Sequence, residues 1–460
     1  MREDRIVVYP FEDLQVLDYH ALQQVNEHAK AEIKGRIPFD KRVEYVNIGR
    51  ELVWVKVMAI SSEDNNILFY GILEHLRVEV KNSICMISIS LSSGTLLMDL
   101  EEHVRSFQSR EFTYKDLLDV CSAEYDNSAQ IMMTGKNKQI PHFIMQYRET
   151  DWSFIKRLAT MNQTVVFADC LTKGEKYHFG IPDRGSEASE FSDYQIQYDM
   201  EEFWNKKKSG LTIHLEDEIS YVWESREIHK LGECKIVEGK SLVIWKIETY
   251  IKGNELYHIC FMKPCLGLQS IMLQNSCLSG VSLLGEVKSV MQDRVQVIIH
   301  CDEYKNTEKL CWFLFSSIYS SGDGTGWYCM PEVGDIVRIY FPTDKEEDAY
   351  VASAYHEKGT ELRTNPECKF WRNKEGKEIQ LSPERILLTN NNGTYIELSD
   401  KDGLQMVSDG SITIYAHESL RILAGLDVEL SARNEVILKQ DDTRMNLGGN
   451  IVMQGAKVML

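Results

Sequence analysis

Two carboxylates near the middle of the chain have the types and spacing that acid–base chemistry uses. Glu149 and Asp151 flank Thr150 directly before a periodic apolar stretch, and two carboxyl groups can hydrolyse a glycosidic bond. Acidic residues at the start of a helix also complement the partial positive charge of its N-terminus. Support for the helix is the interpretation that we favour for both residues.

The other reactive residue types are scattered along the chain. The 12 histidines show no metal-ligand spacing, and the 11 cysteines contain no Cys-x-x-Cys pair, which predicts free thiols and neither a metal site nor a cofactor. The glycine-rich segment 322–326 lacks the Lys-Ser/Thr sequence of a phosphate-binding loop, so we expect a surface loop. The lysines at 206–208 could contact an acidic neighbour, but we expect them to lie in a solvated loop. The sequence therefore does not predict an enzyme.

Composition narrows the class of protein. The chain has 460 residues, of which 43% are hydrophobic and 26% charged, which is typical of folded globular domains. Its net charge of -19 disfavours a nucleic-acid partner. The sequence contains neither a long apolar membrane segment nor an apolar signal-peptide core. We therefore expect synthesis in the cytoplasm, and any export must proceed without a cleaved leader.

Strands that alternate between apolar and polar residues must position these side chains. The clearest lie at 53–57, 84–91, 295–299 and 336–341. Helices are expected at 114–125, after Thr113 as a cap, and at 151–161. Trp152, in the second helix, is expected either to anchor the core or to contact another subunit. Residues 1–270 thus form a mostly β body with two or three helices, and 284–355 suit a small closed β-barrel.

A period of eight residues dominates the C-terminal part of the sequence. Each unit has two apolar residues separated by one residue, which is polar in all but the last unit, and the units are joined by turn-forming segments. The apolar pairs are Ile396 and Leu398, Leu404 and Met406, Ile412 and Ile414, Leu420 and Ile422, Val428 and Leu430, and Val436 and Leu438.

Two inward side chains per unit cannot form a core alone. Three arrangements would bury them to different degrees: a single-chain β-helix, a flat meander, and a prism of three chains. We favour the prism because it closes the core and leaves no sheet edge. Its blunt end would carry Val458, Met459 and Leu460, and such an apolar patch calls for a capping partner.

The chain resembles the VgrG spike proteins of type VI secretion and other contractile injection systems, which are similar to phage late-control D and baseplate-hub proteins. The most specific match is the helix at 149–159, with its Asp151-Trp152 pair. Segments 25–29 and 112–118 and the Pro-Glu-Val-Gly-Asp-Ile-Val turn at 331–337 are also similar to the family's motifs.

The resemblance implies a mainly β homotrimer. Its parts would be a hub of two β-barrels with a few helices at 1–270, an oligonucleotide/oligosaccharide-binding-like neck at 280–356, a connector at 357–387, and a triple-stranded β-helical spike at 388–460. The implied partners are an inner-tube (Hcp-like) protein, baseplate and sheath components, a PAAR-type tip protein and effectors. The assembled protein would be exported with the apparatus.

Two family features have no counterpart in the sequence. Only about 30 residues separate the neck from the eight-residue units (octads), too few for the muramidase domain of some phage relatives. The His-x-His sequence with which some spikes bind iron does not occur. The alternative function is a β-rich phage-type cell-wall hydrolase or a glycan-binding baseplate protein that uses the small barrel.

Overall fold

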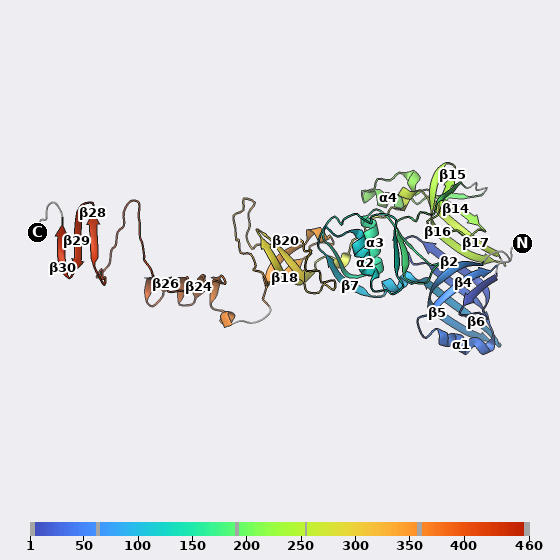
Figure 1. Ribbon diagram of the computed structural model, residues 1–460, viewed down its shortest axis with the longest axis horizontal. Helices are drawn as coiled ribbons and strands as arrows, with labels where there is room; N and C mark the ends of the chain where they lie inside the picture. Colours follow the sequence, from blue (N-terminus) through green and yellow to red (C-terminus); the bar gives the residue numbers. More distant parts are fainter. Residues whose placement is uncertain (1–4, 61–64, 189–192, 254, 357–360, 455–460) are drawn as a thin grey trace. The chain divides into compact units, whose positions relative to one another are not determined.

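The computed structural model describes residues 5–60, 65–188, 193–253, 255–356 and 361–454. The chain divides into two units, residues 1–357 and 358–460, and both consist mainly of β-strands (Figure 1). The predicted mainly β fold is therefore confirmed. The finer domain boundaries stay predictions.

A 12-stranded sheet forms the framework of the first unit. Its first half contains β1 (Arg5–Tyr9), β2 (Gln15–Gln24), β3 (Lys30–Ile37), β4 (Trp54–Ile60), β5 (Asn65–Lys81) and β6 (Ile84–Ser93). Its second half contains β12 (Ser186–Ala188), β13 (Gln195–Gln197), β14 (Ser220–Ser225), β15 (Cys234–Val237), β16 (Lys240–Lys252) and β17 (Glu255–Lys263). The halves have separate hydrophobic cores, and antiparallel pairing of β2 with β16 joins them.

Helices α2 (Tyr114–Ser122) and α3 (Asp151–Met161) lie between the two halves in the sequence. Helix α1 (Arg42–Ile48) belongs to the first half, between β3 and β4, and α4 (Met200–Lys208) to the second half, between β13 and β14. Thr113 and Asp116 form a reciprocal capping box at α2, which confirms the predicted cap. Helix α3 has the predicted bounds, with Thr150 as its N-cap. Strands β8 (Ala129–Met132), β10 (Val166–Ala168) and β11 (Lys176–Phe179) form a small sheet beside them.

The expectation of a solvated loop at the three lysines was wrong. They end helix α4, and the Lys206 side chain is buried. Its ammonium group donates to the Glu218 carboxylate and to the Gly267 carbonyl, each at 2.7 Å. A buried cation is tolerated here because an anion and a carbonyl oxygen replace its water.

A five-stranded sheet follows, made of β18 (Ser282–Met291), β19 (Arg294–Ile299), β20 (Trp312–Leu314), β21 (Ile336–Tyr340) and β22 (Tyr350–Tyr355). A bridge between Phe315 and Val351 brings its two ends together. The enclosed core includes Val287, Val297 and Ile339, which are fully buried or nearly so. This is the small closed barrel that the sequence predicted.

The second unit contains two antiparallel meanders. One comprises β23 (Lys369–Arg372), β24 (Glu378–Ser382), β25 (Arg385–Thr389), β26 (Tyr395–Ser399) and β27 (Gly403–Val407). The other comprises β28 (Val436–Gln440), β29 (Thr443–Gly448) and β30 (Asn450–Gln454). Strands β23 and β24 of the first meander lie inside the expected connector at 357–387.

The octads form strands only in part. Those at 396–398, 404–406 and 436–438 are strands, whereas the three central octads, within 408–435, form none. The expectation of one strand per octad was wrong for these three in the single chain. A strand requires a neighbouring backbone to pair with, and in the described part of one chain none lies beside this segment.

Burial of His258 should make the stability of the first unit pH-dependent. Its Nδ1 lies 2.9 Å from the Thr249 hydroxyl, and burial, aided by nearby His229, lowers its pKa to about 4. Between that value and the unfolded value of about 6.5, the unfolded chain binds more protons. The free energy of unfolding should therefore fall with decreasing pH, by about 3 kcal/mol at pH 4.

Urea unfolding between pH 7 and pH 4.5 measures this slope. His258→Gln should flatten it, whereas His20→Gln, which removes an exposed histidine, should leave it unchanged. Equal slopes in the wild type and His258→Gln would contradict the assignment.

Candidate functional site

A two-stranded ribbon links the body to the small barrel. It pairs β7 (Glu102–Phe107) with β9 (Ile144–Thr150). Phe107 and Ile144 belong to the core around α2 and α3. Phe143 and Met145 belong to the barrel core. Because neighbouring residues of one ribbon are buried in two cores, the body and the barrel are held together at this joint.

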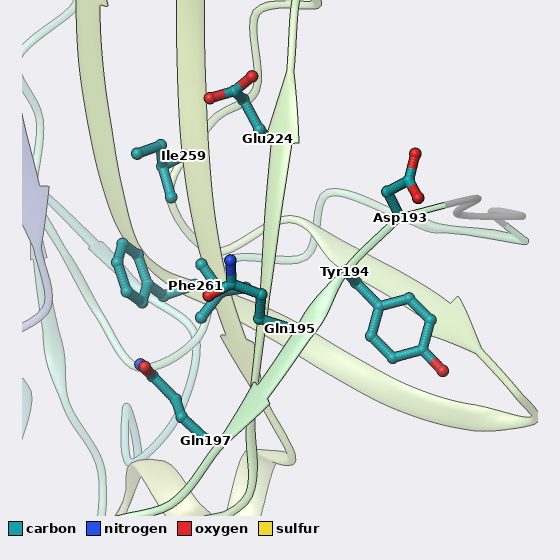
Figure 2. A pocket seen from close by; sticks show the side chains of 8 residues that line it. Asp193, Tyr194, Gln195, Gln197, Glu224, Ile259 and Phe261 are labelled. Carbon is teal, nitrogen blue, oxygen red and sulfur yellow. The ribbon is translucent and has the colours of Figure 1, made fainter.

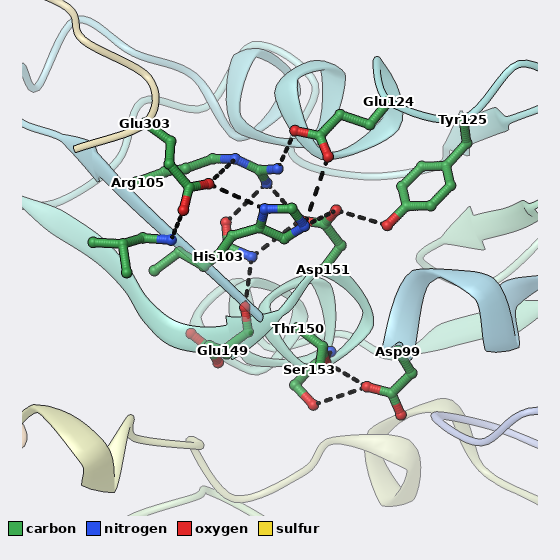
Figure 3. Close-up of polar contacts among 12 residues, drawn as sticks. Asp99, His103, Arg105, Glu124, Tyr125, Glu149, Thr150, Asp151, Ser153 and Glu303 are labelled. Atoms are coloured by element: carbon green, nitrogen blue, oxygen red, sulfur yellow. Dashed lines mark hydrogen bonds and ion pairs between the residues drawn. The ribbon is translucent and has the colours of Figure 1, made fainter. Parts of the chain in front are cut away.

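A cluster of charged side chains surrounds Arg105 on β7 (Figure 3). Its guanidinium group donates to Asp151 Oδ1 at 2.6 Å and to Glu124, and it is only 2% exposed. Asp151 is completely buried and also accepts from Gln146 Nε2 at 3.0 Å and from the Tyr125 hydroxyl at 2.9 Å. These partners replace the water that the carboxylate loses.

A second buried cluster centres on Arg157 in α3. It donates from Nη2 to Glu149 at 2.9 Å and from Nη1 to Glu346 at 2.7 Å, and Nη2 also reaches the Met145 carbonyl. Burial raises the pKa of Glu149, and the neighbouring Glu346 raises it further, while Arg157 opposes both. Glu346 follows the barrel strand β21, so this arginine joins the helix to the barrel.

Two further barrel carboxylates complete the joint. Asp302 accepts from the backbone N–H and the hydroxyl of Ser106, and burial raises its pKa. Glu303 accepts from the backbone N–H of Val104 at 3.0 Å and contacts His103. Both lie just after β19, about 200 residues from the ribbon that they contact.

The predicted motif residues belong to this joint. Trp152 is completely buried and packs against His28, with ring centroids 4.9 Å apart. Between a core anchor and a subunit contact, the structure places it in the core. Glu149 and Asp151 are held by Arg157 and Arg105. Carboxylates engaged in this way support the joint and do not form a glycosidase pair.

An open hollow lies elsewhere, along the edge strand β13 (Figure 2). Gln195, Gln197, Glu224, Ile259 and Phe261 are among its lining residues. The lining offers amides and the carboxylates of Asp193 and Glu224. None of these residues belongs to the small barrel, which the hydrolase alternative would use.

The predicted spike core residues of the first meander share one face of its sheet. In the first meander, the register places Ile379 opposite Leu388, Leu388 opposite Ile396, and Ile396 opposite Met406. The adjacent row contains Leu381, Ile386, Leu398 and Leu404. The opposite face carries Gln380, Leu387, Glu397 and Gln405. One face is thus wholly apolar in both rows.

Within the described part of the chain, this apolar face is not covered. Leu398, Leu404 and Met406 are 49–64% exposed, and Ile396 is half-buried. The apolar residues of the three central units are exposed to a similar degree, and so is Leu438, whereas Val436 is half-buried. These central residues are Ile412, Ile414, Leu420, Ile422, Val428 and Leu430. An apolar surface of this extent marks an interaction site. The expected tip residues Val458, Met459 and Leu460 lie outside the described residues.

Sequence reasoning missed most of the joint. Arg105, Arg157, Glu303 and Glu346 come from four separated segments. Arg157 and its partner Glu149 lie eight residues apart inside the recognised motif at 149–159. The contacts to the barrel span up to 200 residues, and no motif or period connects those residues.

Neither a protein-family profile nor a curated protein matches the sequence. Solved structures do match. One is an E. coli component of the type VI secretion system that is itself similar to the T4 bacteriophage tail proteins gp27 and gp5. It shares 12% identity and a TM-score of 0.55 over 76% of this chain and 100% of that chain.

Chains of the PdpA–VgrG complex match over a larger part of this chain. In the lidless complex the TM-score is 0.59 at 9% identity, over 88% of this chain and 98% of that chain. In the lidded Francisella complex the TM-score is 0.57 at 9% identity, over 86% of this chain and 76% of that chain. The chain therefore has the fold of hub-and-spike proteins. Within that class, it has the VgrG-like fold that the resemblance predicted. In the described residues, no helix has the length and hydropathy to span a bilayer.

Replacing Arg157 tests the joint. Arg157→Met would leave the buried carboxylates of Glu149 and Glu346 without a counter-charge. We expect a loss of about 3–5 kcal/mol in the free energy of unfolding, measured with urea. Lys156→Met, on the neighbouring, less buried position of the same helix, should cost less than about 1 kcal/mol. Comparable losses in both variants would show that the Arg157 cluster does not stabilise the joint.

Proposed function

We propose that this chain is a structural, non-enzymatic subunit of a contractile injection machine, in which three copies form a hub and a puncturing spike. The single observation that carries the proposal is the uncovered apolar face of residues 379–438. Likeness to hub-and-spike structures supports the same role.

The exposed face requires a partner on energetic grounds. Burying an aliphatic side chain completely contributes about 1.5–3 kcal/mol. Leu398, Leu404, Ile414 and their neighbours are about half exposed, so each would add about 1 kcal/mol on association. Summed over the octads, this gain is comparable with the cost of bringing chains together, roughly 4–15 kcal/mol.

Three copies would provide the apolar side chains and the backbone of this segment with more partners than two copies would. A face-to-face pair would cover the side chains of the meanders, yet it would give residues 408–435 no backbone partner. Three chains wound around one axis place a neighbour on both sides of each segment and remove the open edges. The triple-stranded arrangement is also what the resemblance implies for 388–460.

The remaining assignments follow from the same role. The hub would dock on an Hcp-like inner tube, with baseplate and sheath components around it. A PAAR-type protein would cap Val458, Met459 and Leu460. Effectors would travel with the spike, and the protein would leave the cell with the apparatus. The buried joint suits this use because it ties the hub to the neck against an axial force.

A second candidate function is glycan binding by the small barrel. Tyr319, Trp327 and Tyr328 line a hollow beside its loop at 317–330 and are more than half exposed. Aromatic faces of this kind can stack on sugar rings. Binding of peptidoglycan fragments by a monomeric chain would favour this function over the spike.

Light scattering of the purified full chain distinguishes the two functions. The spike predicts particles with three times the chain mass of 53.1 kDa and no release of fragments from cell wall. A monomer that cleaves or binds cell wall would reverse the proposal.

A charged residue inside the core of the proposed spike gives a sharper test. Ile414→Asp would place three carboxylates in one layer of the trimer core, at several kcal/mol each, so trimer yield should fall at least tenfold. Thr413→Asp adds the same charge to the neighbouring residue, whose side chain would point outward, and should leave the yield unchanged. If Ile414→Asp trimerises as well as Thr413→Asp, residue 414 is not in the core.

A further inference from the structure

Three side chains of the joint turn ligand atoms toward one point. His103 Nε2 lies 3.5 Å from Asp151 Oδ2 and 3.7 Å from Glu124 Oε2. Each of the three residues offers one ligand atom, and these atoms lie within 4.8 Å of one another. Figure 3 shows the three side chains converging from β7, from the segment after α2, and from the start of α3.

The imidazole of His103 lacks a partner on this side. The residue is 5% exposed, and its Nε2 is buried without a hydrogen bond. Its other nitrogen, Nδ1, lies 3.1 Å from Glu303 Oε2. If Nδ1–H donates to Glu303, the lone pair of Nε2 faces two carboxylate oxygens. That arrangement is repulsive unless Nε2 carries a proton or a cation lies between them.

Arg105 does not supply that cation. It binds Oδ1 of Asp151 and Oε1 of Glu124, so the other oxygen of each carboxylate remains directed at His103. The Tyr125 hydroxyl donates to Asp151 Oδ2, which leaves that oxygen a further lone pair. The carboxylates of Glu124, Asp151 and Glu303 outnumber the single guanidinium by two. A divalent cation would bring this cluster to neutrality.

We infer that His103, Glu124 and Asp151 bind a divalent transition-metal ion, with zinc the best match. Zinc binds imidazole and carboxylate at about 2.0–2.2 Å, so neighbouring ligands of a tetrahedral ion lie about 3.3–3.5 Å apart. The separations from His103 Nε2 are close to this range. An imidazole ligand disfavours Mg²⁺ and Ca²⁺, which prefer oxygen.

The surroundings fit such a site. Glu303 orients His103 through Nδ1, as carboxylates commonly do for metal-bound histidines. The Glu124 side chain is 49% exposed, so an ion can enter from solvent and a water can fill a fourth position. The ion would link β7 to the segment after α2 and to the start of α3. Through Glu303 it would also link these elements to the barrel. It would therefore stabilise the joint against separation.

Zinc titration of the chelator-treated full chain tests the site. We expect one zinc per chain by calorimetry and metal analysis, and a rise in the thermal unfolding midpoint on saturation. Glu124→Gln removes an exposed ligand without emptying the core, and it should weaken binding at least tenfold. Glu101→Gln removes the same charge from an exposed residue two positions from His103 and should bind like the wild type.

Two results would overturn the inference. Equal zinc binding by the wild type and Glu124→Gln would mean that zinc binds other histidines. No zinc binding by the wild-type chain would mean that the three side chains contact one another without a metal ion.

Discussion

Apolar side chains and backbone polar groups must both find partners, and among the described residues of one chain the C-terminal segment has few of either. The apolar faces of its meanders are about half exposed, and residues 408–435 form no strand in the described chain. By contrast, the first unit has closed cores around its sheet, its helices and its small barrel. In the proposed assembly, the molecule would therefore be self-sufficient up to the barrel and would depend on other copies beyond it.

The joint between body and barrel solves a different physical problem. Apolar packing alone resists separation weakly once water enters, whereas Arg157 and Arg105 link carboxylates from both parts in a buried environment. Breaking such a pair would strand a charge away from water. A spike driven by contraction must pass force from hub to shaft, and this joint lies on that path in the proposed assembly.

The sequence predicted what short-range patterns encode. Alternation located β4, β6, β19 and β21, and the Thr150-Asp151 start located α3 with its bounds. The eight-residue period identified the apolar residues of the first meander that share a face. The strands that it predicted within 408–435 are absent from the single described chain. Strand formation there depends on a neighbouring backbone, which the period does not encode. Lys206, and the cluster of His103 with Glu124 and Asp151, were not predictable, since only folding brings these distant residues together.

The most direct test of the account is an electron cryomicroscopy map of the purified full chain. The account predicts a threefold axis along residues 396–438, with the Ile414 side chains of three copies in contact around it and with neighbouring chains paired to residues 408–435. A map in which this segment packs only against its own chain, without a threefold axis, would contradict the central claim.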